Sequence, residues 1–302
     1  MTAPVTRDDL RDRIADLSVW TGKNGERAPH KPLLLLWALA RCARGEERMV
    51  SYTVVDEAVK PLLVEFGPPR RSYHTEYPFW YLRSDGLWEV RGAGEAKVRE
   101  GKADQPTKGE LIRVGAEGGL LPDVYELLRS DPRLLHDLAQ ELLVAHFPDT
   151  VHADILDAVG LDELELIRRR RRDPEFRTSV LTAYGYRCAV CDFDARLENA
   201  PLAVEAAHIM WHQAGGPDRV SNGIGFRSLH DKLLDRGAFT LGPAYEIVVS
   251  ELVNGGPATQ EALIRFHGTR MQLPRKSASH PDATFVEWHR REVFRSRELE
   301  AS

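Results

Sequence analysis

The segment from Leu33 to Ala40 constrains the fold most, because all of its residues are apolar. Pro32 precedes the segment and Gly45 follows it, and these residue types commonly begin and end a helix. A helix that is apolar on every side is buried in a core. The run is also much shorter than the roughly 20 residues that span a membrane. We therefore predict a helix over Leu33–Ala43 at the centre of a hydrophobic core.

Weaker patterns around this helix predict an α+β chain with many helices and a small β-hairpin or sheet. Thr6 is a typical N-cap residue, and Asp131-Pro132 and Asp173-Pro174 each combine a cap with proline at the first helical position. A further helix is expected at about 54–65. Two aromatic-rich runs, 79–83 and 87–91, flank a Ser-Asp-Gly turn and predict a β-hairpin.

The boundary between two domains is expected where an acidic stretch meets five consecutive arginines, Arg168–Arg172. A chain of 302 residues is too long for one small domain and suits two of ordinary size. We therefore predict an N-terminal domain of residues 1–165 and a C-terminal domain of residues 166–302.

The net charge of the chain is -5, which by itself argues mildly against a nucleic-acid partner. The charge is uneven, however: residues 27–113 and 168–302 each carry a net charge of +3, whereas residues 114–167 carry -10. Two basic regions joined by an acidic connector suit a protein with two nucleic-acid sites. A solvated helical face would give the same charges.

The cysteines and the N-terminus bear on the compartment. Three cysteines in a chain of this length cannot form a disulfide framework. The N-terminal residues lack the apolar stretch of a secretory signal, and no run is long enough to span a membrane. We expect a cytoplasmic protein with no membrane partner.

The most informative motif places Asn222 14 residues after His208, and His230 eight residues after Asn222. The residues around each of the three also form a pattern: Ala-Ala-His-Ile, Asn-Gly-Ile and Leu-His-Asp-Lys-Leu-Leu-Asp-Arg-Gly-Ala-Phe. This pattern resembles the HNH, or ββα-metal, nucleases, in the branch found in modification-dependent restriction enzymes. The resemblance implies a C-terminal domain in which a two-stranded hairpin and a helix hold one divalent cation.

The resemblance also implies a role for each residue. His208 would be the general base that deprotonates water, because a neutral imidazole accepts a proton at cytoplasmic pH. His230 would be a metal ligand, and Asn222 would either orient the loop that carries His208 or join the metal shell. Mg²⁺ is the default ion, and an imidazole ligand also suits Mn²⁺, Co²⁺ or Ni²⁺. Ala207 stands where many members have a metal ligand, so another must come from Asn222, Asp231, Asp235 or Glu205.

Cys188 and Cys191 have the spacing of a zinc knuckle, but a structural zinc site uses four ligands. Relatives that bind zinc have a second pair near the Asn-His segment, where this chain reads Phe226-Arg227-Ser228. We therefore expect two buried thiols and no structural zinc.

The N-terminal half contains two segments typical of nucleic-acid contacts. His30 and Lys31 lie at a helix start, where exposed N–H groups favour phosphate. The segment 70–80 interleaves cations, aromatics and proline. Together with His146-Phe147-Pro148, these segments resemble the sulfur-binding domain, which is joined to HNH nucleases in enzymes that restrict phosphorothioated DNA.

In such domains an apolar cup receives the sulfur that replaces a phosphate oxygen. The resemblance implies that Tyr77 and Pro78 form the wall of this cup and that His30 and Lys31 are the basic pair. Sulfur is less well hydrated than oxygen, so an apolar wall penalises oxygen more. Arg70 and Arg71 are further candidates for contacts with DNA.

The two resemblances together imply an endonuclease that binds phosphorothioated double-stranded DNA and cuts nearby, as a homodimer because a double-strand break needs two cuts. One alternative reads a methylated base, which would require a pocket for a flipped base. Another is a DNA-binding protein with an inactive HNH domain, to which Ala207 points.

Overall fold

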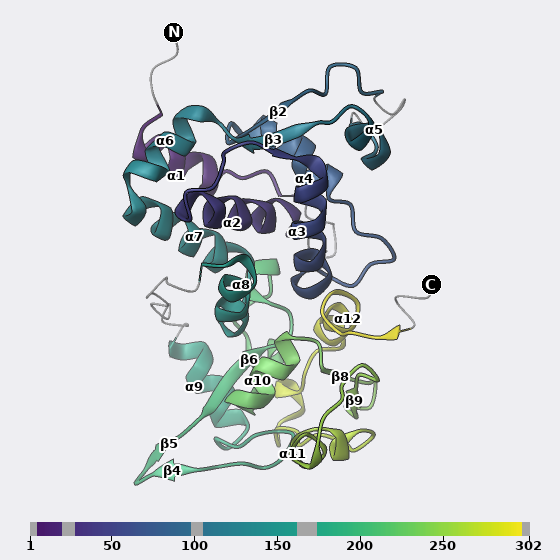
Figure 1. Cartoon of the computed structure of the whole chain (residues 1–302). Helices are drawn as coiled ribbons and strands as arrows, with labels where there is room; N and C mark the ends of the chain where they lie inside the picture. The colour runs from purple at the N-terminus through teal and green to yellow at the C-terminus, as the bar shows by residue number, and fades with distance from the viewer. Residues whose placement is uncertain (1–4, 20–27, 98–104, 162–173, 298–302) are drawn as a thin grey trace.

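The computed structural model describes residues 5–19, 28–97, 105–161 and 174–297, with the arrangement drawn in Figure 1. Two separate hydrophobic cores organise these residues. The first is built from residues between Leu10 and Leu161, and the second from residues between Phe176 and Val286. The predicted boundary at residue 165 and the arginines 168–172 lie outside the described residues.

Helix α2 (His30–Ala43) lies at the centre of the first core, as predicted. Every side chain from Pro32 to Ala40 is buried. The helix has no polar face because its neighbours cover it on several sides. These neighbours are α3 (Tyr52–Phe66), α4 (Glu76–Tyr81), α6 (Pro122–Ser130), α7 (Pro132–His146) and α8 (His152–Val159).

Two helix starts follow the cap residues that the sequence indicated. Before α1 (Arg7–Ala15), the Thr6 hydroxyl accepts the N–H of Asp9 at 3.1 Å, and the Asp9 carboxylate accepts the N–H of Thr6 at 3.1 Å. This reciprocal capping box satisfies two backbone donors. The Asp131 carboxylate accepts the N–H of Leu134 at 3.2 Å at the start of α7. The predicted starts of both helices are therefore confirmed.

The predicted hairpin at 79–91 is wrong. Its first half is helical, forming α4 and the short helix η1 (Leu82–Asp85), because Phe79 and Leu82 bury one helical face. Its second half is strand β2 (Trp88–Arg91), which pairs with the remote β3 (Glu117–Leu120). Short aromatic runs fit the periodicity of both a helix and a strand, so the local sequence did not distinguish these two structures.

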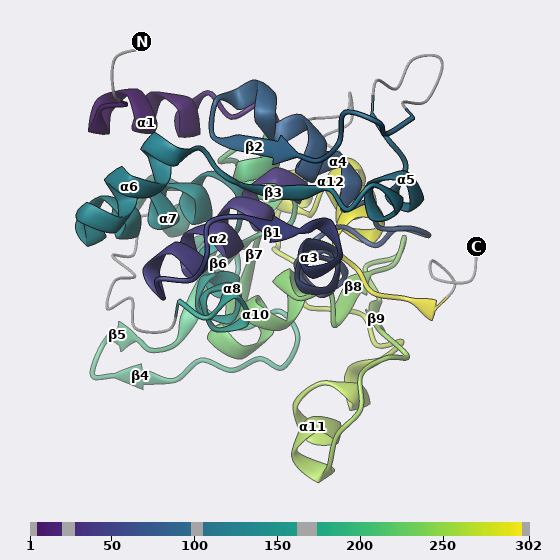
Figure 2. The same ribbon diagram turned by 45° about the horizontal axis from the view of Figure 1, so that its top comes forward.

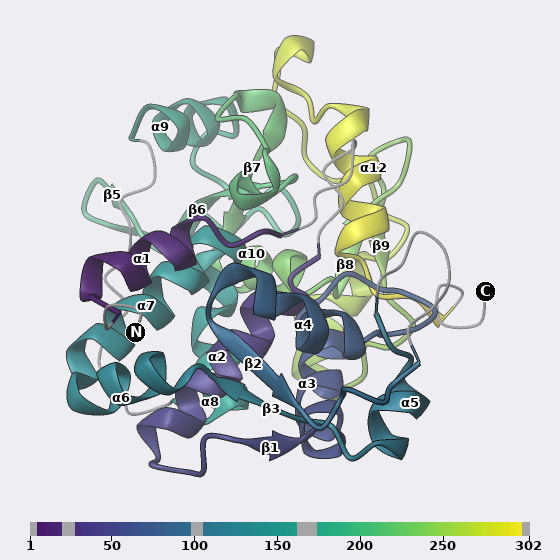
Figure 3. The same cartoon turned by 90° about the horizontal axis from the view of Figure 1, so that it is seen from above.

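A three-stranded antiparallel sheet covers part of the first core, in the order β1 (Val50–Ser51), β3, β2, seen side by side in Figure 3. Gly118 lies in the central strand β3. A Cβ at this position would come within 2.4 Å of the Phe79 ring. Glycine therefore lets the strand approach the aromatic side chains of the core closely. The short helix α5 (Lys108–Arg113) lies next to α3.

The second core is built on an antiparallel hairpin of β6 (Val204–His208) and β7 (Gly223–Arg227), with His208 paired to Gly223. Helices α9 (Pro174–Ala183) and α10 (Ser228–Asp235) pack on this hairpin. The strand–loop–strand–helix order implied by the HNH resemblance is therefore present. The remaining elements are β4 (Arg196–Leu197), β5 (Ala200–Pro201), β8 (Phe239–Leu241), β9 (Ile247–Val249), α11 (Pro257–Ala262), α12 (Ala283–Glu292) and the short helices η2 (Asp149–Val151), η3 (His212–Ala214), η4 (Val220–Asn222), η5 (Ile264–Phe266) and η6 (Ser277–Ser279).

Polar contacts join the part of the chain that forms the first core to the part that forms the second. Helix α10 lies next to α8 in Figures 1 and 2. The Arg295 guanidinium donates to the carbonyls of Val64, Glu65 and Gly67 at the end of α3, at 2.7–2.9 Å. Ion pairs between the two parts, within the described ranges, include Arg70–Glu292 (2.8 Å), Lys232–Asp154 (2.9 Å), Arg236–Glu65 (2.6 Å) and Arg236–Asp154 (3.9 Å). None of the helices in the described ranges is long and apolar enough to cross a membrane.

Candidate active site and nucleic-acid interface

His208 stands at the end of β6 with its ring fixed from two directions. The ring stacks on Phe176 of α9, with centroids 4.1 Å apart and planes 17° apart. Its Nε2 lies 2.7 Å from Asp218 Oδ1, and the side chain is 15% exposed. The imidazole is thus held rigidly at the surface of the hairpin, as a proton acceptor for an external water requires.

Asn222, which is fully buried, closes the loop that joins β6 to β7. Its Nδ2 donates to the carbonyls of Met210 and Pro217, both at 3.0 Å, and its Oδ1 accepts the N–H of Met210 at 2.9 Å. The amide therefore ties the two ends of the loop that follows His208. These bonds favour the loop-orienting role of Asn222 over metal ligation.

His230 lies with the two cysteines of the Cys-x-x-Cys pair. Its Nδ1 is 3.1 Å from Cys188 Sγ and 3.8 Å from Cys191 Sγ, and its Nε2 is 2.7 Å from the carbonyl of Ala262. The three ligand atoms lie within 4.8 Å of one another, the only such metal-ligand group found among the described residues. Thiolates with imidazole suit Zn²⁺ better than Mg²⁺, and an Nε2–H bond to a carbonyl typically orients a metal-binding histidine.

The hydrogen bond from Cys188 lowers the pKa of the Cys191 thiol, and His230 acts in the same direction. A thiolate is therefore favoured at this place, which is the form that binds a metal. The sequence did not predict the cluster of Cys188, Cys191 and His230, because the expected zinc pattern needed a second pair of cysteines. A histidine on the helix after the hairpin was the available signal.

The other predicted metal ligands lie on the same hairpin and helix. Asp235, on α10, accepts a hydrogen bond from Thr150. Glu205, on β6, lies 3.8 Å from Arg177. Asp231 follows His230 on α10 and is 3% exposed.

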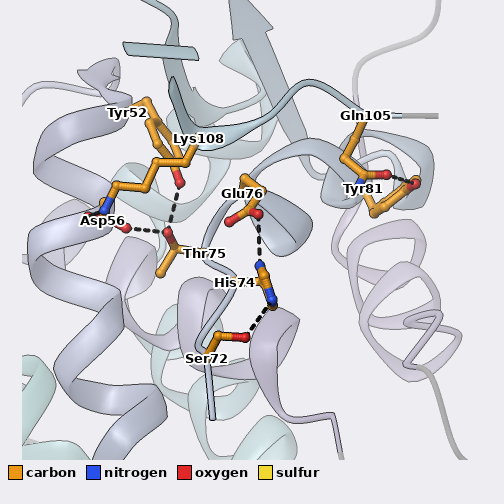
Figure 4. Close-up of polar contacts among 9 residues, drawn as sticks. All are labelled: Tyr52, Asp56, Ser72, His74, Thr75, Glu76, Tyr81, Gln105 and Lys108. Carbon is orange, nitrogen blue, oxygen red and sulfur yellow. Dashed lines mark hydrogen bonds and ion pairs between the residues drawn. The ribbon is translucent and has the colours of Figure 1, made fainter. Parts of the chain in front are cut away.

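The candidate wall residues Tyr77 and Pro78 lie on α4, and Figure 4 shows polar contacts made by α4 and by the loop before it. The ring of Tyr77 stacks on His74, with centroids 4.7 Å apart and planes 10° apart. His74 is in turn held between Glu76 Oε1 and Ser72 Oγ, each at 2.9 Å. Pro78 is buried beside them. The Tyr77 ring therefore stacks on a histidine whose two ring nitrogens are both held by hydrogen bonds.

The start of α4 is anchored to α3 through Thr75, which is fully buried. Its hydroxyl is 2.9 Å from the Tyr52 hydroxyl and donates to Asp56 Oδ1 at 2.5 Å. Burial would raise the pKa of Asp56, but hydrogen bonds from Lys108 and Thr75 outweigh it and lower the pKa. The ionised carboxylate thus holds the loop of the candidate site against the core.

The expected basic pair at the start of α2 is not a pair of free cations. Lys31 Nζ is bound to Asp85 Oδ2 at 2.6 Å, and both side chains are nearly buried. Burial lowers the pKa of His30 to about 4, and the charges of His74 and Arg70 act in the same direction. His30 is therefore neutral at physiological pH and lies close enough to His74 to feel its charge, whereas Lys31 forms an internal ion pair.

Arg70 and Arg71 lie on the loop between α3 and α4. Arg70 is half-buried and bound to Glu292 of α12, whereas the Arg71 side chain is exposed. Of the two arginines, Arg71 is therefore the one whose side chain could directly contact a ligand bound at this loop.

Family comparisons identify the N-terminal part of the chain. The profile of the "ScoMcrA-like, DNA sulfur-binding domain" family matches residues 7–164, more than half of the chain. The chain belongs to this family. A second profile, "HNH endonuclease", matches residues 188–242, the range that contains His208, Asn222 and His230. Both predicted resemblances are therefore confirmed.

Solved structures similar to this chain include the sulfur-binding domain of ScoMcrA complexed with phosphorothioated DNA (30% identity, TM-score 0.47, covering 54% of this chain and all of that one). The type IV phosphorothioation-dependent restriction endonuclease ScoMcrA is 29% identical (TM-score 0.44, 54% of this chain). This chain spans only 29% of its length. The sulfur-binding domain of SprMcrA complexed with phosphorothioated DNA is 25% identical (TM-score 0.44, 53% and 97% coverage). A search of curated proteins found no match.

Two half-buried histidines, His30 and His146, lead us to expect that the sulfur-binding domain loses stability in acid. Burial lowers the pKa of both His30 and His146 to about 4, from 6.5. Because the folded pKa is depressed, the unfolded chain takes up protons first as the pH falls below 6.5. The free energy of unfolding should therefore drop by roughly 2 kcal/mol per histidine at pH 5 relative to pH 8.

Urea unfolding of the full chain at several pH values measures this effect. A protein with both His30→Gln and His146→Gln should show a flatter dependence on pH, even if it is less stable throughout. His136→Gln is the control and should keep the full slope. Equal slopes for the double variant and the wild type would contradict the prediction.

Proposed function

We propose that this protein is a modification-dependent restriction endonuclease that binds phosphorothioated double-stranded DNA and hydrolyses phosphodiester bonds nearby. The proposal is supported by the presence of two domains in one chain. These are a sulfur-binding domain at residues 7–164 and an HNH domain whose hairpin holds His208 in a fixed position. The first domain would select the modified backbone, and the second would cut it.

In the nuclease domain, His208 takes a proton from water, and the resulting hydroxide attacks phosphorus. A divalent cation, when bound, supplies stabilisation of the charge on the phosphate and the leaving oxygen. Asp231 and Asp235 would hold it, since both are buried on α10 beside the hairpin and carboxylate oxygens are the ligands that Mg²⁺ and Mn²⁺ prefer. Asn222 keeps the loop after His208 closed.

We also propose that Cys188, Cys191 and His230 supply three of the four ligands of a Zn²⁺ ion with a structural role. Their donor atoms are two sulfurs and one imidazole nitrogen, a soft set that does not suit the hard cation of phosphodiester hydrolysis. This proposal assigns His230 to a different metal from the catalytic one that the HNH resemblance implied.

In the sulfur-binding domain, we propose that Tyr77 and Pro78 form the wall that contacts sulfur. The Tyr77 ring is rigid because it stacks on His74, and the neighbouring His30 is neutral. An uncharged, partly apolar wall removes water from the modified phosphate, which costs less for sulfur than for oxygen. Arg71 would contact the phosphate backbone, and two copies of the chain would cut the two strands.

The Tyr77→Ala substitution tests the reader. Affinities are measured for matched duplexes that are phosphorothioated, methylated or unmodified, using protein with His208→Ala so that nothing is cut. We expect this protein to bind the phosphorothioated duplex at least about 10-fold more tightly, which is about 1.4 kcal/mol. Adding Tyr77→Ala should abolish this ratio and spare the salt-sensitive binding that all three duplexes share.

Tyr81→Ala is the matched control, since Tyr81 lies on the same helix and donates its hydroxyl to Gln105. It should keep the preference for sulfur. Preference for the methylated duplex would support a base reader instead, and equal binding of all three duplexes would contradict the proposed specificity.

A further inference from the structure

Asp218 makes a contact with the candidate general base that the HNH motif does not specify. It is the residue after Gly215-Gly216-Pro217, ten positions beyond His208, and its Oδ1 lies 2.7 Å from His208 Nε2. A carboxylate can only accept a hydrogen bond, so His208 is the donor. The neutral imidazole therefore carries its proton on Nε2 and its lone pair on Nδ1.

The loop that carries Asp218 is built to return over His208. Gly215 has a φ of +86°, which L side chains rarely adopt. A Cβ on Gly216 would lie 1.9 Å from the Met210 carbonyl oxygen, so only glycine fits there. With Asn222 bonded to both Met210 and Pro217, the position of Asp218 is set by the loop itself.

We infer that Asp218 is the positioning residue for His208, holding the imidazole in the Nε2–H form, in which Nδ1 carries the lone pair that takes a proton from water. The inference rests on the proposed nuclease function. Stacking on Phe176 fixes the plane of the imidazole ring. The contact of Asp218 with Nε2 selects one of the two flipped ring orientations that share this plane. His212 Nε2 also lies 4.0 Å from Asp218 Oδ2.

Water gives one proton to His208 Nδ1, its oxygen forms a bond to phosphorus, and the bond from phosphorus to the leaving sugar oxygen breaks. The leaving oxygen takes a proton from solvent, and His208 later returns its own proton to solvent. The Asp218 carboxylate stabilises the imidazolium that exists between these transfers, as an aspartate does in catalytic triads.

Two substitutions separate the hydrogen bond from the charge. Asp218→Asn keeps an oxygen that accepts Nε2–H but removes the charge, and Asp218→Ala removes both. Asp194→Asn is the control, because Asp194 is a carboxylate of the same domain that pairs with Arg187 and not with His208. All variants should bind phosphorothioated DNA as the wild type does.

The first measurement is the tautomer of His208 by ¹⁵N correlation spectra of the imidazoles, assigned with His208→Ala. We expect the Nε2–H form in the wild type and in the control, and loss of this preference in Asp218→Ala. The second is the single-turnover rate of cleavage at saturating protein. It should fall about 10²-fold or more in Asp218→Ala and by a smaller factor in Asp218→Asn.

An unchanged tautomer in Asp218→Ala would overturn the inference, and so would a lost preference that leaves the cleavage rate unchanged. If the wild type cleaves none of the duplexes, the proposed function fails. The spectra would then still decide whether Asp218 fixes the His208 ring.

Discussion

Replacing His208 with alanine should lower the single-turnover rate of cleavage of phosphorothioated DNA by about 10²- to 10⁴-fold, the usual contribution of a general base. The side chain stands at the end of β6, stacked on Phe176 and bonded to Asp218, where it can accept a proton from an external water. Affinity for the DNA should not change, because the proposed sulfur-binding residues lie on α2, α4 and the loop before α4, away from β6 in the sequence. The rate is measured with Mg²⁺ and with Mn²⁺.

His212→Ala is the matched control, since His212 lies on the same loop and its ring is 6.2 Å from that of His208. It should retain most of the activity. Full activity of His208→Ala would show that another group is the base. Loss of binding together with cleavage would mean that the substitution acts on folding.

Removing the metal from the Cys188, Cys191 and His230 cluster should unfold the nuclease domain. We expect about one Zn²⁺ per chain in the purified protein, because structural zinc sites contribute roughly 10 kcal/mol or more in small domains. The Cys188→Ser and His230→Gln variants should each lose this zinc and unfold at a lower temperature. Atomic absorption and thermal unfolding, with and without a strong chelator, measure the two effects.

Cys42→Ser is the control, because Cys42 is equally buried but lies in the other core. The Cys42→Ser protein should still contain about one Zn²⁺ per chain. A zinc-free wild type whose unfolding does not respond to a chelator would instead support the sequence expectation of two buried thiols.

The features that the sequence predicted correctly depend on local physics. Leu33–Ala40 has no polar face, so the helix must be central, and Thr6 and Asp131 cap the helices that follow them. The hairpin and helix of the HNH domain followed from a motif whose spacing reflects its strand–loop–strand–helix order.

The features that the sequence did not predict depend on remote partners. Strand β2 pairs with Glu117–Leu120, and Lys31 binds Asp85, a residue 54 positions away. Sequence patterns report charge but not the partner that neutralises it. The sequence did not predict that His230 lies with Cys188 and Cys191, since His230 and Asp231 are neighbours about 100° apart on α10 and spacing alone does not say which one faces the cysteines.

We propose that one chain both recognises and cuts phosphorothioated DNA. The most direct measurement compares single-turnover cleavage of a phosphorothioated duplex with that of the same unmodified sequence, at physiological salt with Mn²⁺. We predict cleavage of the phosphorothioated duplex at a rate at least about 10-fold higher, a ratio that Tyr77→Ala abolishes. Equal cleavage of both duplexes would contradict sulfur recognition, and binding without any cleavage would contradict the nuclease activity.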